Sequence, residues 1–498
     1  MSGQNIGLGS WPARRARLSP NTVALRYGER EYTYRQLADR VEALAGGLRA
    51  HGIERGDRVA YFGANHPDLL TTLFAASRSG AITVLLNSRL SPAEISFMID
   101  DSRPKMLIHG HEVTSVVQRL DPEIKETLNA IDVDSADFTA LLREEPPPHV
   151  AVHLDDACLL MYTSGTTGKP KGAVLTHGNI FFNDINVLIE TDLTSHEVCL
   201  AVAPLFHIAG LNGLVLPVIL KGGTVEILPS FVPGTVLDTI QQRGVTCMFG
   251  VPAMLDALSA EPEFTPDTLA SLTTVIVGGA PVPERTLRRW AEHDVDVQQG
   301  YGLTETAPAV LKLSAQDARK HIGSAGKPQF LVDVRLADPS GDTVEDASIG
   351  EILTRGPNVF QEYWDRPDAT DDAFHDGWFR TGDIASVNDD GFYTLKDRSK
   401  DMYISGGENV YPAEIESVLL DIDGIAEAAV VGVPDKTWGE VGRAFLVLTP
   451  DAAWTETSLM EVLQDRLARY KQPKSIRFVE ELPRTSTGKL RKNILRDS

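Results

Sequence analysis

The stretch Met161–Gly172 reads MYTSGTTGKPKG and continues from the apolar run 157–161. Its glycines allow backbone conformations that other residues avoid, so a ligand can approach the main chain closely. Its glycines, hydroxyls and cations are Thr163, Ser164, Gly165, Thr166, Thr167, Gly168, Lys169, Lys171 and Gly172. Backbone N–H groups, hydroxyls and ammonium groups that converge on one point bind anions. The stretch therefore predicts a phosphate-binding loop after a buried strand.

A Walker A loop is the first alternative for such a stretch. That loop has four residues between its glycines and a Ser or Thr after its lysine, which ligates Mg²⁺. Here two residues separate Gly165 from Gly168, and Pro170 follows Lys169. An ordinary P-loop kinase is therefore disfavoured. A flexible surface loop is the second alternative, and the paired lysines directly after a strand argue against it.

The segments around this loop alternate between strand and helix patterns. A capping box that begins at Thr33 predicts a helix near the N-terminus. Strand patterns at 58–62 and 82–86 flank a helix pattern at 67–79, and similar alternation returns between 173 and 300. Such alternation predicts a parallel α/β sheet.

The rhythm of the sequence changes in the last third of the chain. From about residue 320, short apolar runs between Gly and Pro turns predict a β-rich section. After Lys400, a helix led by Pro412, two strands and a further helix near 459–467 predict an α+β domain. The predicted fold class is α/β, with a large N-terminal domain of stacked α/β sheets plus a β-rich subdomain, and a small mobile α+β C-terminal domain. The predicted domains are 1–399 and 400–498.

Charge excludes some partners. The chain has 498 residues, with 47 Lys and Arg against 69 Asp and Glu, which gives a formal net charge of −22. Nucleic-acid backbones bind clustered basic surfaces, so nucleic acid is disfavoured as a partner. An anionic membrane surface is disfavoured for the same reason. An anionic substrate must therefore be met by local cations within an acidic protein.

Cysteine usage and hydropathy indicate the compartment. Cys158, Cys199 and Cys247 are widely separated, which predicts reduced, buried thiols rather than a disulfide framework or a zinc cluster. The first 20 residues lack the apolar core of a secretory signal. The uncharged stretch 198–220 is long enough to cross a bilayer, but prolines, glycines, a histidine and an asparagine interrupt it. We therefore expect a buried strand–loop–helix there, no integral membrane segment, and a cytoplasmic protein.

Six segments, in chain order, resemble the motifs of the adenylate-forming superfamily, which includes acyl-CoA synthetases, nonribosomal peptide adenylation domains and luciferases. They are MYTSGTTGKPKG at 161–172, GGAP at 278–281, QGYGLTET at 299–306, RTGD at 380–383, KDRSKD at 396–401 and PRTSTGK at 483–489. The resemblance covers essentially the whole chain, with acyl-CoA synthetases and 4-coumarate-CoA ligases as the nearest pattern. It implies an acid–thiol ligase that uses ATP, Mg²⁺ and coenzyme A.

Such an enzyme solves a simple chemical problem. A carboxylate is a poor acyl donor because its leaving group would be oxide, whereas a mixed anhydride with AMP has a good leaving group that a thiol can displace. Repulsion between the carboxylate and the triphosphate must be offset by cations. The resemblance assigns Lys489 to bridging the carboxylate and the α-phosphate, and Thr304 to donating to that phosphate. Glu305 offers the oxygen ligand that Mg²⁺ prefers.

The other motifs imply further nucleotide and CoA contacts. The resemblance places Gly279, Ala280, Pro281, Gly300, Tyr301 and Gly302 around adenine, Asp383 on the ribose hydroxyls, Arg398 on ribose or phosphate, Lys400 at the hinge, and Gly406 and Gly407 along the pantetheine path. A rotating small domain would supply Lys489 for the first half-reaction and the two glycines for the second. Plainer interpretations stay open: a turn residue for Asp383, a core aromatic for Tyr301, and a simple turn for Gly406 and Gly407.

The class of acyl substrate is indicated by the absence of charged residues from the segments that are expected to line the acyl pocket. Amino-acid-activating relatives carry Asp directly after the phenylalanine of 206–210, and this chain carries His207, so an amino acid is disfavoured. His207 is expected to gate the acyl pocket, with a buried core histidine as the alternative. The segments 206–220, 249–255 and 306–310 contain no Lys or Arg, which disfavours a dicarboxylate. We predict a monocarboxylic acid with an apolar body: a medium or long aliphatic chain, or an aryl or aryl-propenoic acid.

Free CoA is the leading acceptor. The segment PDKTWGE at 434–440 is similar to one common in CoA ligases, and no carrier-protein domain follows it. One alternative is an adenylating enzyme that delivers its acyl group to a carrier protein in trans, or that activates a group other than a carboxylate. The other is a noncatalytic nucleotide-binding sensor, which Glu305 and Lys489 disfavour because binding alone would not require them.

Overall fold

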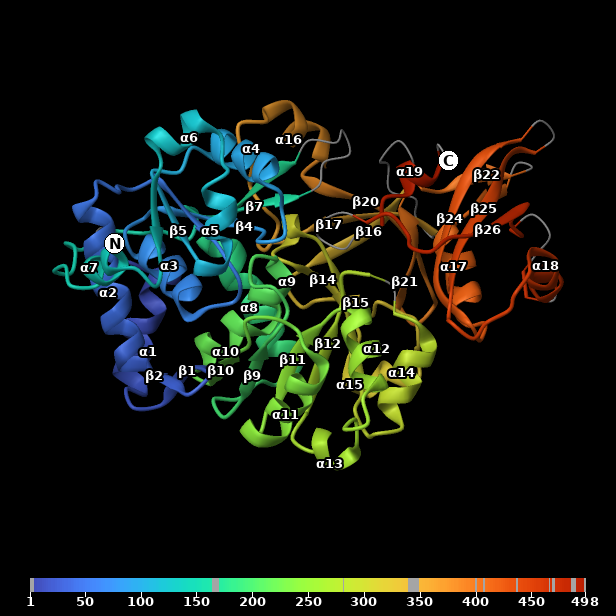
Figure 1. Ribbon diagram of the computed structural model, residues 1–498, viewed down its shortest axis with the longest axis horizontal. Coiled ribbons are helices and arrows are strands. Elements are labelled where there is room, and N and C mark those ends of the chain that lie inside the picture. The colour runs from blue at the N-terminus through green and yellow to red at the C-terminus, as the bar shows by residue number, and fades with distance from the viewer. Residues whose placement is uncertain are drawn as a thin grey trace.

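Two stacked sheets form the body of the protein, and a smaller unit follows them at the C-terminal end (Figure 1). The computed structural model describes residues 4–163, 170–280, 282–338, 349–398, 401–405, 408–435, 438–464, 466–467, 471–484 and 490–496. The expected α/β fold class, with a large N-terminal and a smaller C-terminal domain, is confirmed.

The first sheet has seven strands. In spatial order they are β18 (Glu362–Tyr363), β8 (Lys171–Thr176), β7 (Ala157–Thr163), β4 (Ile82–Leu86), β3 (Arg58–Phe62), β5 (Met106–His109) and β6 (Asn129–Asp132). The five strands from β7 to β6 run parallel, as the strand–helix alternation predicts. Strand β8 folds back on β7, with Lys171 opposite Thr163, so the predicted phosphate loop joins a hairpin. A Walker A loop would instead lead into a helix.

The second sheet has nine strands. In spatial order they are β15 (Lys327–Pro328), β14 (Ala309–Lys312), β13 (Val297–Gly302), β12 (Thr274–Val277), β11 (Cys247–Gly250), β9 (Val198–Ala201), β10 (Thr224–Ile227), β1 (Val23–Tyr27) and β2 (Arg30–Thr33). The six strands from β13 to β1 run parallel, and the others are antiparallel additions at the two edges.

Helices fill the space between the sheets and cover both outer faces. Alternate residues of a strand face opposite sides, so Tyr61 and Cys199 face the shared core, while Phe62 and Leu200 face the outer layers. The helices of the shared core are α1 (Trp11–Leu18), α2 (Tyr34–Ala50), α3 (Pro67–Arg78), α8 (His177–Thr191) and α10 (Leu216–Lys221). The outer layers contain α4 (Pro92–Ser102) on the first sheet, and α11 (Pro233–Arg243), α12 (Pro252–Ala260) and α14 (Glu284–Ala291) on the second.

Local signals explain where the elements begin and end. Thr33 and Gln36 form the predicted capping box at the start of α2. The stretch 198–220 is β9, then α9 (Ile208–Gly210), the π-helical segment η3 (Leu211–Val215) and α10, so the expected buried strand–loop–helix is confirmed. None of the described helices is long and apolar enough to cross a membrane. The remaining short helices are η1 (Leu8–Ser10), η2 (His111–Val113), α5 (Thr114–Val117), α6 (Pro122–Thr127), α7 (Ala136–Leu141), α13 (Pro266–Leu269), η4 (Thr304–Thr306), α15 (Ala315–Ala318) and α16 (Pro367–Ala373).

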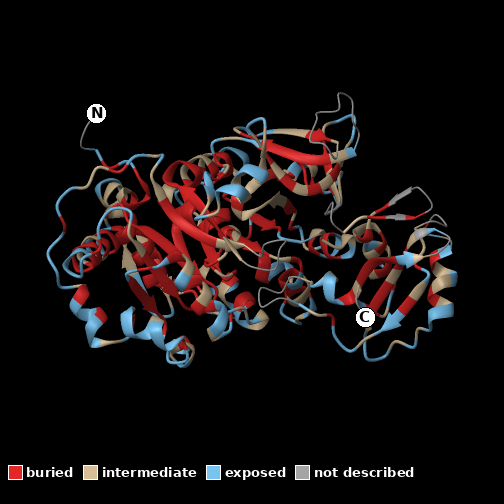
Figure 2. Cartoon of the chain, turned by 90° about the horizontal axis from the view of Figure 1, so that it is seen from above, coloured by how far each residue is buried: buried red, intermediate tan, exposed pale blue. Residues whose placement is uncertain are grey.

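The last third of the chain builds two smaller sheets. The β-rich section that follows the large sheets contains β16 (Asp333–Ala337), β17 (Ile349–Arg355), β19 (Phe374–His375), β20 (Trp378–Val387) and β21 (Tyr393–Arg398). The C-terminal unit contains β22 (Tyr403–Ser405), β23 (Glu408–Val410), α17 (Pro412–Leu420), β24 (Ile425–Asp435), β25 (Gly439–Leu448), α18 (Glu456–Gln464), β26 (Ser475–Phe478) and α19 (Lys492–Arg496). Buried residues lie on both faces of its sheet, and this buried core is separate from that of the large body (Figure 2).

Candidate active site

The described residues of the predicted nucleotide motifs come from three sheets. Gly278, Gly279 and Ala280 follow the carboxyl end of β12, and Gly300–Gly302 form the end of β13 beside it. Ligands of open parallel sheets bind outside these carboxyl ends. The hairpin β7–β8 of the first sheet contributes Thr163, and β20 of the third sheet contributes Asp383.

Glu305 is the centre of a small polar cluster. Its side chain belongs to η4 and is buried, with 6% of the residue exposed. Its Oε1 atom accepts hydrogen bonds from the Tyr363 hydroxyl at 2.8 Å and from the Thr163 hydroxyl at 3.3 Å. Within the described part of the chain, no Lys, Arg or His forms an ion pair with it. A buried carboxylate that has no cationic partner among the described residues fits a bound Mg²⁺, which prefers few protein oxygens when phosphates supply the rest.

Tyr363 is a site residue that the sequence did not reveal. Burial and the neighbouring Glu305 raise the pKa of its phenol above the usual value, so it stays a hydrogen-bond donor at neutral pH. The ammonium group of Lys171 lies 5.1 Å from the centre of its ring, within cation–π distance. A single tyrosine within the β-rich last third of the chain has no motif or spacing that would mark it.

Asp383 and Tyr301, which come from two different predicted motifs, contact one another. The Tyr301 hydroxyl donates to Asp383 Oδ2 at 2.8 Å, and Asp383 is 7% exposed. Tyr301 also packs against the core of the β-rich section, so it touches both the predicted nucleotide residue and a buried cluster. Arg398 pairs with Asp383 across β20 and β21, which places its backbone next to that carboxylate.

An ion pair between Arg380 and the buried Glu351 holds the part of β20 that precedes Asp383. Glu351, 6% exposed, accepts from an Arg380 guanidinium nitrogen at 2.6 Å and from the Gly382 N–H at 3.0 Å. The hydrogen bond to Glu351 raises the pKa of Arg380. Gly382 has a φ of +72°, a conformation that other residues rarely adopt. The turn of the RTGD motif is therefore fixed by backbone conformation and by charge.

Three asparagines that carry no sequence signal hold the loop after Glu305. Asn212 Nδ2 donates to the Ala307 carbonyl at 2.6 Å, and Asn183 Oδ1 accepts from the Ala309 N–H at 3.2 Å. Asn358 Nδ2 donates to the Thr306 and Ala309 carbonyls, both at 2.8 Å. Buried amides that satisfy a loop backbone give it one conformation. Thr304, which begins this loop, is half-buried.

Phe249 belongs to one of the uncharged segments predicted to line the acyl pocket, and two glycines lie beside its ring. A methyl group placed on Gly213 would lie 3.5 Å from the Phe249 ring, and one on Gly278 would lie 3.6 Å from it. The two glycines therefore flank this ring from η3 and from the end of β12. His207 is half-buried at the start of α9, with its ring centre 4.8 Å from that of Phe206. Gly279 and Ala280 are exposed.

Several predicted residues have no place in this description. Those outside the described residues are Ser164, Gly165, Thr166, Thr167, Gly168, Lys169, Pro281, Lys400, Gly406, Gly407 and Lys489. The backbone of Arg398 is described and its side chain is not. The assignments of these residues stay predictions.

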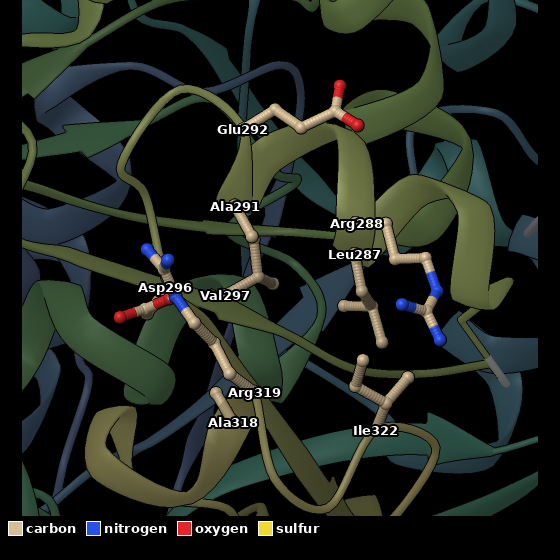
Figure 3. Close-up of a pocket in the computed structure, with 9 residues that line it drawn as sticks. All are labelled: Leu287, Arg288, Ala291, Glu292, Asp296, Val297, Ala318, Arg319 and Ile322. Atoms are coloured by element: carbon tan, nitrogen blue, oxygen red, sulfur yellow. The ribbon is translucent and has the colours of Figure 1, made fainter.

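A pocket of about 440 Å³ lies elsewhere, between α14, the start of β13 and α15. Leu287 and Ile322 point toward one another across it (Figure 3). Its two arginines, Arg288 and Arg319, form ion pairs with Glu284 and Asp296. None of the predicted site residues lines it.

Comparison with known proteins agrees with this geometry. The model of the AMP-binding enzyme family matches residues 12–364, and that of the AMP-binding enzyme C-terminal domain matches residues 414–489. The chain belongs to the AMP-binding enzyme family. The expected membership of the adenylate-forming superfamily is thereby confirmed.

Relatives of this AMP-binding enzyme match it along nearly its whole length. It is 49% identical over 493 residues to a feruloyl-CoA synthase of an Amycolatopsis species, and the match covers 99% of each chain. It is 39% identical over 496 residues to an indoleacetate–CoA ligase of Aromatoleum aromaticum, over 98% of this chain and 97% of that protein. Its structure resembles o-succinylbenzoate coenzyme A synthetase (MenE) from Bacillus subtilis in complex with ATP and a magnesium ion. That match has a TM-score of 0.87 and 34% identity, and it covers 98% of both chains.

Proposed function

We propose that this AMP-binding enzyme activates an aryl-propenoic or related aryl acid as its acyl-adenylate and transfers the acyl group to CoA. The enzyme is an ATP-dependent acid–thiol ligase, with ATP, Mg²⁺ and CoA as cofactors and fatty or aryl acids as the substrate class. The observation that carries the proposal is the buried Glu305 cluster beside the Asp383–Tyr301 pair. Glu305 would be the metal-binding carboxylate and Asp383 the ribose-binding carboxylate, and each is buried with defined hydrogen-bond donors.

In the first half-reaction, a carboxylate oxygen of the acid attacks the α-phosphorus of ATP, and pyrophosphate leaves. Glu305 would hold Mg²⁺, which neutralises phosphate charge when bound. Asp383, fixed by Tyr301, would accept from the ribose hydroxyls. Lys489 and Thr304 would orient the α-phosphate and the attacking carboxylate. The loop 164–169 would contribute N–H and hydroxyl donors to the phosphates.

In the second half-reaction, the CoA sulfur attacks the acyl carbonyl, a thioester bond forms, AMP leaves, and the thiol proton passes to solvent. We place the domain boundary between residues 399 and 400, so that the C-terminal domain rotates about Lys400. Rotation would withdraw Lys489 and bring Gly406 and Gly407 to the pantetheine path. His207, at the start of α9, would gate the acyl pocket, and Arg398 would follow the nucleotide.

The aryl choice rests on two supports. Ferulate is an aryl-propenoic acid, and the feruloyl-CoA synthase is 49% identical over the full length. The ring of Phe249 lies beside Gly213 and Gly278, and it offers a flat, apolar surface for an aryl group. We also place the enzyme in the cytoplasm, because all three cysteines are described as free and buried thiols.

A panel of acids tests this proposal. Pyrophosphate release and thioester formation are measured with ferulate, indole-3-acetate and palmitate, with and without CoA. We expect the highest kcat/KM with ferulate and one thioester per pyrophosphate. A preference for palmitate would contradict the aryl assignment. AMP release without thioester would contradict free CoA as the acceptor and would favour a carrier protein.

A further inference from the structure

Tyr363 lies between the predicted phosphate loop and Glu305. Strand β18 pairs with β8 so that Tyr363 is opposite Ala173, and the Trp364 N–H donates to the Gly172 carbonyl at 2.7 Å. A methyl group on Gly172 would lie 3.4 Å from Trp364 Cβ. The segment 362–364 therefore lies directly along the strand that leaves the loop.

Both parts of the Tyr363 side chain are used. The hydroxyl donates to Glu305 Oε1 at 2.8 Å, and the ring lies 5.1 Å from the Lys171 ammonium. The Phe360 N–H also donates to the Glu305 carbonyl at 2.7 Å. The same segment thus holds the backbone of Glu305, its carboxylate and the lysine at the end of the loop.

The segment is fixed at its other end to the strand that enters the loop. Asp101, the penultimate residue of α4, forms an ion pair with Arg366 at 2.5 Å and accepts from the Tyr162 hydroxyl at 2.8 Å. The Trp364 indole donates to the Asp101 carbonyl at 3.2 Å. Tyr162 directly precedes Thr163, so Asp101 joins strand β7 of the hairpin to the segment that carries Tyr363.

We propose that Tyr363 is a positioning residue for metal–nucleotide binding: its hydroxyl fixes the Glu305 carboxylate and its ring fixes Lys171 beside the phosphate loop. The inference rests on the proposed function, because it takes Glu305 as the Mg²⁺ ligand. A carboxylate held by a short hydrogen bond presents its other lone pairs in one direction. Loss of a partner that orients a metal ligand typically weakens metal binding about 10- to 100-fold.

Three variants separate the two parts of the side chain from general stability. Tyr363→Phe removes the hydroxyl and keeps the ring, whereas Tyr363→Leu removes both. Tyr34→Phe is the matched control, because it removes a buried hydroxyl that donates to the Gly223 carbonyl at 2.6 Å, far from the site. Mn²⁺ binding is measured by electron paramagnetic resonance with a non-hydrolysable ATP analogue, and binding of the metal-free analogue is measured by calorimetry.

We expect Tyr363→Phe to weaken Mn²⁺ binding about 10- to 100-fold while it leaves binding of the metal-free analogue unchanged. Tyr363→Leu should weaken the binding of both Mn²⁺ and the metal-free analogue, because Lys171 loses its contact with the aromatic ring. Tyr34→Phe should bind metal and nucleotide as the wild type does, even where its thermal stability falls. Thr163→Val removes the longer hydrogen bond to Glu305, at 3.3 Å, so its loss of Mn²⁺ affinity should be smaller than that of Tyr363→Phe.

The inference alone would be overturned by wild-type Mn²⁺ affinity in Tyr363→Phe, or by equal losses of nucleotide affinity with and without metal. A greater loss in Thr163→Val than in Tyr363→Phe would also overturn it, and this comparison uses a second, independent variant. A wild-type enzyme that bound no Mn²⁺–nucleotide would overturn the proposed function together with the inference. The two failures are therefore distinguishable.

Discussion

Gly302→Ala should disable adenylation through one steric contact. Gly302 ends β13, and the loop that follows it carries Thr304 and Glu305. A methyl group on Gly302 would lie 1.6 Å from the Pro308 carbonyl oxygen and 3.1 Å from Thr306 Oγ1. Such atoms keep at least 3.0 Å apart, so the two sides of the loop must separate by 1.4 Å or more. The blocking atom is a backbone oxygen, which cannot rotate away as a side chain could.

The size of the effect follows from that displacement. The Leu303 N–H and the Thr306 hydroxyl close the loop at 2.9 Å, so movement at Pro308 is transmitted to the residues between them. A displacement of about 1 Å in a positioned catalytic group costs roughly 100-fold in rate. Overpacking of this kind also destabilises a protein by about 1–3 kcal/mol. We therefore expect a loss of at least 100-fold in kcat/KM and a modest fall in stability.

The assay is acid-dependent ATP–pyrophosphate exchange, which reports the first half-reaction alone. Gly234→Ala is the control, because a methyl group there meets nothing within 4 Å. A cooperative thermal unfolding transition in both variants would show that each variant is folded. An exchange rate in Gly302→Ala within threefold of the wild-type rate would contradict this steric explanation, since the loop would then tolerate the displacement or the site would lie elsewhere.

Three further predictions test separate parts of the account. Lys489→Ala should abolish pyrophosphate exchange and largely spare thioester formation from supplied acyl-AMP, and surviving exchange would remove Lys489 from its role. Gly213→Leu should raise the KM for ferulate at least tenfold through contact with Phe249 and leave ATP binding unchanged. An unchanged KM would show that the acyl pocket does not lie beside Gly213. Burial lowers the pKa of His177 to about 4. The unfolded chain, whose histidine has a pKa of about 6.5, therefore binds an extra proton between these two pH values. The free energy of unfolding falls by roughly 3 kcal/mol as the pH falls through this window. In urea unfolding at several pH values, His177→Gln should lack this part of the pH dependence, and an identical slope in both proteins would contradict the assignment.

Local sequence signals predicted the features whose causes are local. The capping box of Thr33 and Gln36 opens α2, and the alternating segments around 58–86 form β3, α3 and β4. Two of the glycine motifs lie at the ends of β12 and β13, whereas Gly382 lies within β20, where its φ of +72° favours glycine. The interruptions in 198–220 marked a buried passage rather than a membrane helix.

The contacts that complete the site are long-range, and no local pattern encodes them. Tyr363 is 58 residues from Glu305 and Thr163 is 142 residues from it, yet both donate to the same oxygen. Asn212 and Ala307 are 95 residues apart. Only the sheet order brings these segments together, because β18 pairs with β8 and η4 follows β13. A motif identifies the residues expected to contact the ligand, and it does not identify the distant residues that hold them in position.

The charge of −22 also takes on a local meaning. Glu305, Glu351 and Asp383 are buried acids with defined hydrogen-bond donors. Lys171 lies at the predicted phosphate loop and stacks on Tyr363. The total charge therefore describes the exterior, while anion binding depends on where a few cations and N–H groups are placed.

Transfer of a carboxylate oxygen from the acid to AMP is the most direct test of whether the enzyme adenylates the carboxylate. The enzyme is incubated with ATP, Mg²⁺, CoA and ferulate labelled with ¹⁸O in both carboxylate oxygens, and the products are analysed by mass spectrometry. The account predicts one ¹⁸O in AMP and one in the feruloyl thioester, because the attacking oxygen stays with AMP when the thiol displaces it. Label in pyrophosphate or inorganic phosphate, or unlabelled AMP, would contradict adenylation of the carboxylate.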